Sequence, residues 1–353
     1  MALRMGALAL ALGLPFAFAP PSAAALSPEE VDAGAAAAAA EVARHVEKLA
    51  SNRMAGRDNG TPGSRRAQKY IVKRLKPVAE PLGAKPYRQP FQRDEKGTNL
   101  VALIPGRELP DEYVVVGGHY DHFGPGKCGP EIGTNDRICN GATDNASGTA
   151  MVLAIGAAIA QLPEAPRRSV VLALWDAEED GLEGSQHYVE SDPLVPLEAT
   201  VAYVNLDLLG ATLIPSLANN TFAIGGETGG TALRDLVAEA ASHHTVDLTP
   251  LSYPFGQGRS DYFPFGQAGV PVVSFGDSSS ACYHTAGDEI ARVDFAKLAE
   301  QTALAFRTVV GVAETETPPA FVAPAAGPTY EDAVALAGLV ALSVPADLDL
   351  FPP

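Results

Sequence analysis

Short runs of apolar residues recur along the chain without the polar alternation of a half-exposed strand. The clearest run is Ser-Val-Val-Leu-Ala-Leu at 169–174, and comparable runs lie at 112–116 and 201–205. Strands that are apolar on both faces are typical of a parallel sheet that is covered on both sides. The same criteria predict further strands at 89–91, 98–104, 222–224 and 271–275.

Helical patterns lie between these runs. Ser27 is an N-cap residue, and Pro28 and two acidic residues follow it, so a helix is expected to begin here and to continue to Leu49. Apolar spacing predicts further helices at 64–80, 149–162, 233–243, 295–312 and 331–343. Because strands and helices alternate, the predicted fold class is α/β, with a mostly parallel central sheet flanked by helices on both faces.

The two ends of the chain differ in composition from its middle. Arg4 precedes an apolar stretch at 6–19 and three alanines at 23–25, which is the pattern of a secretory signal peptide. The apolar stretch is too short to span a membrane. Beyond Thr317, proline, alanine and glycine predominate, which predicts a surface linker. The predicted organisation is a signal peptide at 1–25, one α/β domain at 26–314, and a linker with a short helical tail at 315–353.

Charge narrows the possible partners. The 353 residues include 25 basic and 42 acidic side chains, which give a formal net charge of −17. A chain this acidic is a poor candidate for binding nucleic acid or an anionic membrane surface, and it fits a secreted or periplasmic protein. The sequence does not indicate an oligomeric state.

The three cysteines bear on the expected export. Cys128 and Cys139 flank a glycine-containing loop and are expected to form a disulfide in an oxidising compartment. Cys282 is left over, and an odd cysteine is either free or competes for one of the other two. The pairing therefore stays open from the sequence alone.

Polar residues follow several of the predicted strands. His119, Asp144, Glu179 and Asp207 fall at or just after a strand end, and His284 lies in a later loop. In open α/β sheets the chemistry collects at the carboxyl ends of the strands. Zinc accepts imidazole nitrogen and carboxylate oxygen, and a catalytic site keeps one position open for water. Five such ligands suit two metal ions if one carboxylate bridges them.

Glu178 and Glu179 are adjacent, and they follow the strand at 169–174. Neighbouring side chains in such a turn can face different ways, so that one holds a metal while the other stays free as a base. An isolated acidic triplet is more often a solvated loop, but the residues at the other strand ends favour the chemical interpretation. The histidines without such a context are assigned structural roles: His122, His187, His243 and His244.

Five motifs occur in a fixed order along the chain. They are Gly-His-Tyr-Asp at 118–121, Gly-Ala-Thr-Asp-Asn-Ala-Ser-Gly at 141–148, Ala-Glu-Glu-Asp-Gly-Leu-Glu-Gly-Ser at 177–185, Asn-Leu-Asp at 205–207 and Tyr-His-Thr at 283–285. Together they resemble the co-catalytic di-zinc exopeptidases, a family that includes bacterial leucyl aminopeptidases and glutamate carboxypeptidase II. The resemblance implies the zinc-exopeptidase fold, with a metal site at the C-terminal ends of the strands.

The resemblance also implies roles for single residues. Glu178 would be the general base, and Asp121 would orient an imidazole that binds metal. The implied zinc ligands are Asp144 as a bridge between two Zn²⁺ ions, His119 and Asp207 on one ion, and Glu179 and His284 on the other.

The activity implied by the resemblance is hydrolysis of peptide substrates at a chain end. The first expectation is an aminopeptidase that hydrolyses N-terminal peptide bonds with a water bridged between two zinc ions. A carboxypeptidase or a glutaminyl cyclase on the same fold is an alternative, and a non-catalytic binding protein on this scaffold is a more remote one. Tyr283 is a candidate for holding the oxyanion, because it is adjacent to His284, and Gln257 and Arg259 are candidates for substrate contacts.

Overall fold

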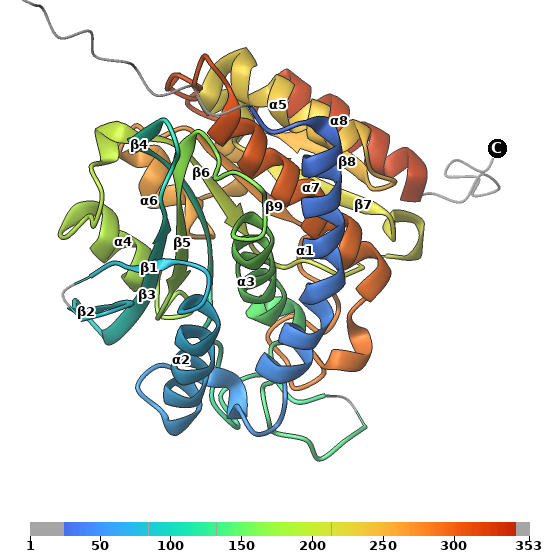
Figure 1. The fold of residues 1–353 in the computed structure, drawn as a ribbon. Coiled ribbons are helices and arrows are strands. Elements are labelled where there is room, and N and C mark those ends of the chain that lie inside the picture. The colour runs from blue at the N-terminus through green and yellow to red at the C-terminus, as the bar shows by residue number, and fades with distance from the viewer. Residues whose placement is uncertain (1–24, 84, 132, 213, 344–353) are drawn as a thin grey trace, which may run out of the picture.

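The computed structural model describes residues 25–343 apart from 84, 132 and 213. The predicted signal peptide lies outside the described residues except for residue 25, and so do residues 344–353 of the tail. One mixed sheet of nine strands runs through the described part of the chain, with helices on both of its faces (Figure 1). The predicted fold class is therefore confirmed.

The order of the strands in this sheet is β1-β3-β5-β4-β6-β9-β7-β8, and β2 pairs with β3 outside this path. The central strands β5, β4, β6 and β9 are parallel to their neighbours within this group. Antiparallel pairs occur toward both ends of the sheet. The strand bounds are β1 Glu80–Pro81, β2 Arg88–Gln92, β3 Lys96–Ile104, β4 Leu109–His119, β5 Arg168–Trp175, β6 Thr200–Leu206, β7 Asn220–Ile224, β8 Asp247–Leu251 and β9 Val272–Gly276.

The apolar runs form the central strands because both faces of the sheet are covered. All positions of β5 are buried, and alternate side chains enter two different hydrophobic clusters. Val170, Leu172 and Leu174 belong to the cluster that includes residues of α1, α3 and α7. The alternate side chains of β5 belong to the cluster that includes residues of α4 and α6, on the other face of the sheet (Figure 1). The bounds of these helices are α1 Pro28–Leu49, α3 Ser147–Ile159, α4 Glu183–Glu190, α6 Tyr262–Gln267 and α7 Phe295–Glu314.

The helix ends follow local sequence signals. Ser27 and Glu30 form a capping box in which each side chain accepts a hydrogen bond from the other residue's backbone N–H, and α1 begins as expected. Helix α2 (Pro62–Leu75) ends earlier than predicted, because Pro77 cannot continue it. The expected helices over 233–243 and 331–343 are α5 (Gly230–Ser242) and α8 (Tyr330–Ser343).

Helix α8 lies beside β8, at the end of the sheet opposite to β1 (Figure 1). It also contacts the short helix Pro215–Leu217. Among the helices that the structure describes, none combines the length and the apolar character needed to cross a membrane.

Candidate metal centre

The predicted site residues meet because the central strands are parallel and in register. β4 ends at His119, which pairs with Trp175 at the end of β5, and Gly117 pairs with Asn205 near the end of β6. The residues that follow these strands consequently lie at one edge of the sheet. Glu178, Glu179 and Asp207 reach the site in this way.

One group of possible metal ligands consists of His119, Glu178 and Asp207, whose ligand atoms all lie within 4.8 Å of one another. Nε2 of His119 is 3.3 Å from Oδ1 of Asp207 and 3.9 Å from Oε2 of Glu178. Nε2 of the same imidazole is 3.4 Å from Oδ1 of Asp144.

A second group consists of His122, Asp144 and Glu179. Nδ1 of His122 is 2.6 Å from Oε1 of Glu179. Nε2 of His284 lies 3.1 Å from Oε2 of the same glutamate and 3.2 Å from Oδ2 of Asp144. His122 was expected to have only a structural role, whereas the structure places it within this second group. Its position three residues after His119, directly behind the strand end, was the signal that could have identified it.

Asp144 lies between the two groups. Its Oδ1 faces His119, and its Oδ2 faces His284 and is 3.8 Å from Nδ1 of His122. Oδ2 is buried, yet none of the described residues forms a hydrogen bond with it. A buried carboxylate oxygen without a hydrogen bond is costly unless a cation satisfies it. This arrangement fits a carboxylate that bridges two metal ions.

Asp121 connects the predicted base to the imidazole of His119. Its carboxylate accepts hydrogen bonds from the backbone N–H groups of Glu178 (3.2 Å) and Glu179 (3.3 Å). Oδ1 of Asp121 also lies 3.5 Å from Nδ1 of His119. One carboxylate therefore fixes the turn after β5 and faces the imidazole nitrogen that points away from Asp207.

Asp288 holds the segment that carries Asp144, although it was not among the predicted site residues. Its carboxylate accepts hydrogen bonds from the backbone N–H groups of Thr143 and Asp144 and from the Thr143 hydroxyl, at 2.9–3.1 Å. The two aspartates are separated by 144 residues along the chain. No local pattern links them, because the contact exists only in the folded chain.

A chain of buried hydrogen bonds supports Asp207 from the other side. The Ser260 hydroxyl donates to Oδ2 of Asp207 at 2.6 Å, and the Asn205 side chain donates to Ser260 at 2.9 Å. Asn205 accepts from the Tyr203 hydroxyl, which in turn accepts from the Trp175 indole. Hydrogen bonds of this kind fix the orientation of a carboxylate and so limit its motion.

The pKa values of three residues in the site differ from their usual ranges. Burial, the charge of Asp207 and further carboxylates raise the pKa of Glu178 well above its usual range, against the opposing effect of His119. Burial lowers the pKa of His119, but Glu178 and Asp207 outweigh it, and the pKa is raised well above normal. Burial also lowers the pKa of His284, but the carboxylates of Asp144 and Glu179 outweigh this effect, and the pKa rises to about 9. The carboxylates of the site thus favour the protonated form of both imidazoles.

Arg57 is a fully buried cation beneath this site. Its guanidinium donates to the backbone carbonyls of Leu49, Tyr120, Asn140 and Gly141 at 2.6–3.0 Å. Burial lowers the pKa of Arg57 to about 10, although the nearby carboxylates oppose this shift. The guanidinium therefore joins three segments that lead into the site.

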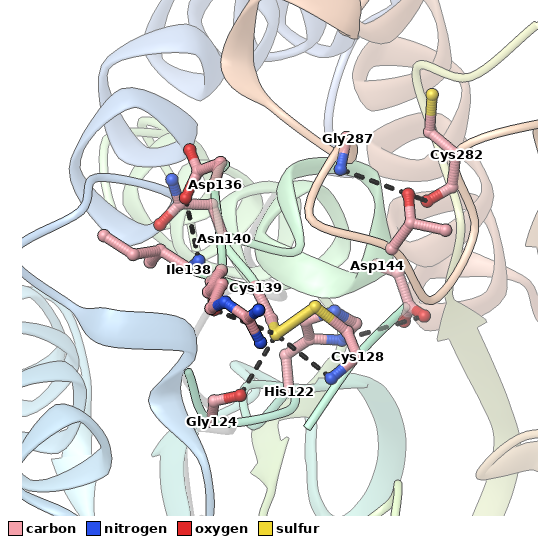
Figure 2. Close-up of a disulfide and its surroundings, with 12 residues drawn as sticks. His122, Gly124, Cys128, Asp136, Ile138, Cys139, Asn140, Asp144, Cys282 and Gly287 are labelled. Atoms are coloured by element: carbon pink, nitrogen blue, oxygen red, sulfur yellow. Dashed lines mark hydrogen bonds and ion pairs between the residues drawn. A yellow bond between two sulfur atoms is a disulfide. The ribbon is translucent and has the colours of Figure 1, made fainter. Parts of the chain in front are cut away.

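A disulfide joins Cys128 and Cys139, and Cys282 is a free cysteine. Figure 2 shows the disulfide beside His122, with Cys282 on a separate segment. Gly129, directly after Cys128, donates a hydrogen bond from its N–H to the carbonyl of His284 at 2.8 Å and accepts one from Ala286 N–H at 2.8 Å. The loop closed by the disulfide therefore holds the loop of His284.

A family comparison agrees with this geometry. Residues 99–309 match the model of peptidase family M28. This chain belongs to peptidase family M28. The resemblance to zinc exopeptidases drawn from the five motifs is thereby confirmed, and the chain is a metallopeptidase by family.

Relatives of this M28 chain include enzymes and solved structures. It is 26% identical over 310 residues to leupeptin-inactivating enzyme 1 of Streptomyces exfoliatus, which covers 80% of this chain and 63% of that enzyme. The structure of the LapA aminopeptidase of Legionella pneumophila superposes with a TM-score of 0.62 at 19% identity, over 81% of this chain and 75% of that chain. The zinc aminopeptidase BSAP of Bacillus subtilis gives a TM-score of 0.62 at 14% identity, over 80% and 97%.

The similarity to these two structures shows the zinc-exopeptidase fold. The M28 chain spans less than two thirds of the length of the first curated relatives that it matches. Zinc suits the side chains of the candidate centre, because imidazole nitrogens and carboxylate oxygens form both groups and no thiolate belongs to either.

A cavity of about 460 Å³ opens above the centre of the M28 chain. Glu178, Asp144 and Asp207 form its acidic end, and Arg259 and Tyr283 are among the other lining residues. The Tyr283 ring stacks on His284 at 3.7 Å between ring centroids. Gln257 is not among the described residues that line this cavity, and the structure gives no support to a substrate contact by it.

Proposed function

We propose that this M28 metallopeptidase is a secreted aminopeptidase that removes residues from free peptide N-termini and uses two zinc ions. His119 and Asp207 would hold one ion, Glu179 and His284 the other, and Asp144 would bridge them. His122 would support Glu179 through the short Nδ1–Oε1 contact. The secretory signal pattern supports export.

The charge of the cavity supports the choice of an aminopeptidase. Three carboxylates face it, whereas Arg259 is the only lysine or arginine among the described lining residues. Asp144 and Asp207 would be neutralised by bound zinc, so the lack of basic side chains is what distinguishes the two activities. A carboxypeptidase has to hold a terminal carboxylate, for which this cavity offers little positive charge.

Glu178 has the properties of a general base. Its Oε2 lies 3.9 Å from Nε2 of His119, so the carboxylate reaches the proposed metal site without the short contacts that Glu179 forms with two imidazoles. A zinc ion, when bound, acidifies a water molecule and polarises a carbonyl oxygen. Glu178 would accept the proton of the attacking water and pass it to the leaving amine.

Asp121 would keep Glu178 in place during this transfer. It binds the backbone of the turn rather than the carboxylate itself, so the carboxylate remains free to move a proton. Tyr283, on the wall of the cavity, would donate a hydrogen bond from its hydroxyl group to the developing oxyanion.

A substrate panel tests the proposal. The protein without residues 1–25 is assayed with leucyl, N-acetyl-leucyl, N-blocked acidic dipeptide and N-terminal glutamine substrates, with and without a strong chelator. Hydrolysis of the free leucyl substrate, its loss on chelation and its return with zinc are expected. Equal hydrolysis of the acetylated substrate, or cyclisation of the glutamine substrate instead, would contradict the aminopeptidase assignment.

A further inference from the structure

The cavity above the metal centre has one wall that comes from outside the family match. Its lining combines acidic residues of the metal centre with a larger number of apolar residues. Part of the apolar lining lies within residues 99–309, as Leu217, Phe222 and Leu251 do. The rest belongs to α8, which is C-terminal to the matched residues and contributes Leu336, Leu339 and Val340.

These three residues lie on one side of α8, because their spacing of three and four places them on the same helix face. Leu339 is only 8% exposed, whereas Leu336 is 38% exposed and Val340 is 59% exposed. None of the three belongs to the two hydrophobic clusters formed by the described residues. Leu336 and Val340 therefore line the cavity and still leave apolar surface open to water.

The start of α8 is fixed by a buried carboxylate. Asp332 is 2% exposed, and it accepts hydrogen bonds from the backbone N–H and the hydroxyl of Ser252 at 2.7 and 2.6 Å. It also accepts hydrogen bonds from the N–H and hydroxyl of Thr329. Ser252 follows β8 directly, so this contact ties the first turn of α8 to the edge of the sheet.

A second polar contact between α8 and the rest of the described chain is weaker. Glu331 lies 3.5 Å from Arg234, and both side chains are exposed, so the pair adds little stability. Beyond its first turn, α8 therefore presents its apolar side chains to the cavity from a position that Asp332 sets.

We propose that α8 is part of the substrate pocket, and that Leu336, Leu339 and Val340 select substrates whose terminal residue has a large apolar side chain. The inference rests on the proposed aminopeptidase function. A leucine-sized side chain in the cavity would cover the open apolar surface of Leu336 and Val340 and remove its own surface from water. A methyl group, as in alanine, offers far less apolar surface for this contact.

The test compares leucyl and alanyl p-nitroanilides. In the double variant Leu336→Ala/Val340→Ala, kcat/KM for the leucyl substrate is expected to fall about 10-fold, as the loss of methyl contacts in an apolar pocket does. The value for the alanyl substrate is expected to stay nearly constant. Val334→Ala is the matched control, because Val334 is 53% exposed on the same helix and does not line this cavity.

Asp332→Ala provides a second variant that leaves the lining side chains unchanged. Release of the first turn of α8 is expected to reduce the preference for the leucyl over the alanyl substrate, as the double variant does. The thermal unfolding midpoint of each variant is measured alongside. An equal fall of kcat/KM for the leucyl and the alanyl substrate in these variants would mean that α8 only supports the fold. This result would overturn the inference.

The outcomes separate this inference from the proposed function. If the zinc-loaded wild-type protein hydrolyses neither substrate, the aminopeptidase proposal fails. If it hydrolyses them but the leucyl-to-alanyl ratio is unchanged in the double variant, or shifts as much in Val334→Ala, the role of α8 fails and the aminopeptidase proposal stands.

Discussion

The carboxylate of Asp288 accepts a hydrogen bond from the backbone N–H of Asp144 at 3.0 Å. This bond orients the residue that faces both halves of the metal centre. In Asp288→Asn the side chain keeps its size but loses its charge and one acceptor oxygen. We expect the affinity for zinc to fall by about 10-fold to 100-fold, as it does when groups that orient metal ligands are changed.

Competition with a chelator of known affinity measures this change directly. Asp294→Asn is a suitable control, because Asp294 caps α7 through Lys297 N–H, outside the two groups of candidate ligands. Equal zinc affinities in the wild type and Asp288→Asn would show that Asp288 does not support the centre.

The disulfide gives a second prediction, because the loop that it closes holds the carbonyl of His284. Replacement of both Cys128 and Cys139 by serine should lower the free energy of unfolding by about 3 kcal/mol, on a chain-entropy model of loop closure. The replacement should also lower the affinity for the zinc ion proposed at Glu179 and His284 more than the affinity for the ion proposed at His119 and Asp207. Zinc titration monitored by calorimetry measures this difference, and two unchanged affinities would contradict the role of the loop. Cys282→Ser serves as the control.

His45 gives a prediction about pH, because burial and then the charges of Arg44 and Arg74 lower its pKa to about 4. Between pH 6.5 and 4 the unfolded chain binds a proton at this position and the folded chain does not. Stability is therefore lost as the pH falls through this window, by up to about 3 kcal/mol. His45→Gln removes the titration and retains a partner for the Tyr70 hydroxyl.

Urea unfolding at several pH values measures the effect. The free energy of unfolding should decrease less steeply from pH 7 to pH 4.5 in His45→Gln than in the wild type. Parallel curves for the two proteins would mean that His45 does not carry a lowered pKa.

The central strands could be predicted because their signal is local. The run at 169–174 is apolar at nearly every position, and β5 is buried on both faces. The edge strands lack such a signal: β1 has two residues, and β8 contains Pro250, which is tolerated at a sheet edge. The short helices α4 and α6 were likewise too short for a periodic pattern to emerge.

The site could be predicted only as far as its residues follow strands or belong to motifs. His119, Glu178 and Asp207 do, and the fold brings them together. Asp288 and Ser260 act through contacts between distant segments, whereas His122 follows the end of β4 but lies outside the five motifs. The contribution of α8 to the cavity depends on where the tail packs, which no periodicity reveals.

Glu179 provides the fourth prediction. Its two carboxylate oxygens lie 2.6 Å from Nδ1 of His122 and 3.1 Å from Nε2 of His284. In Glu179→Gln a ligand of one zinc ion is weakened, so one ion should be lost or bound more loosely, and excess zinc should restore part of the activity. Elemental analysis after dialysis measures the zinc content. Full zinc content and full activity in this variant would contradict the ligand role.

The proposed mechanism depends most on Glu178, and the variant Glu178→Gln tests the role of this residue directly. The amide keeps the size of the side chain but cannot accept the proton of the attacking water. We predict that two zinc ions per chain and the wild-type unfolding midpoint are retained, while kcat falls by about 10²-fold to 10⁴-fold with little change in KM. A variant that turns over at the wild-type rate, or that loses a zinc ion, would contradict the assignment of Glu178 as the general base.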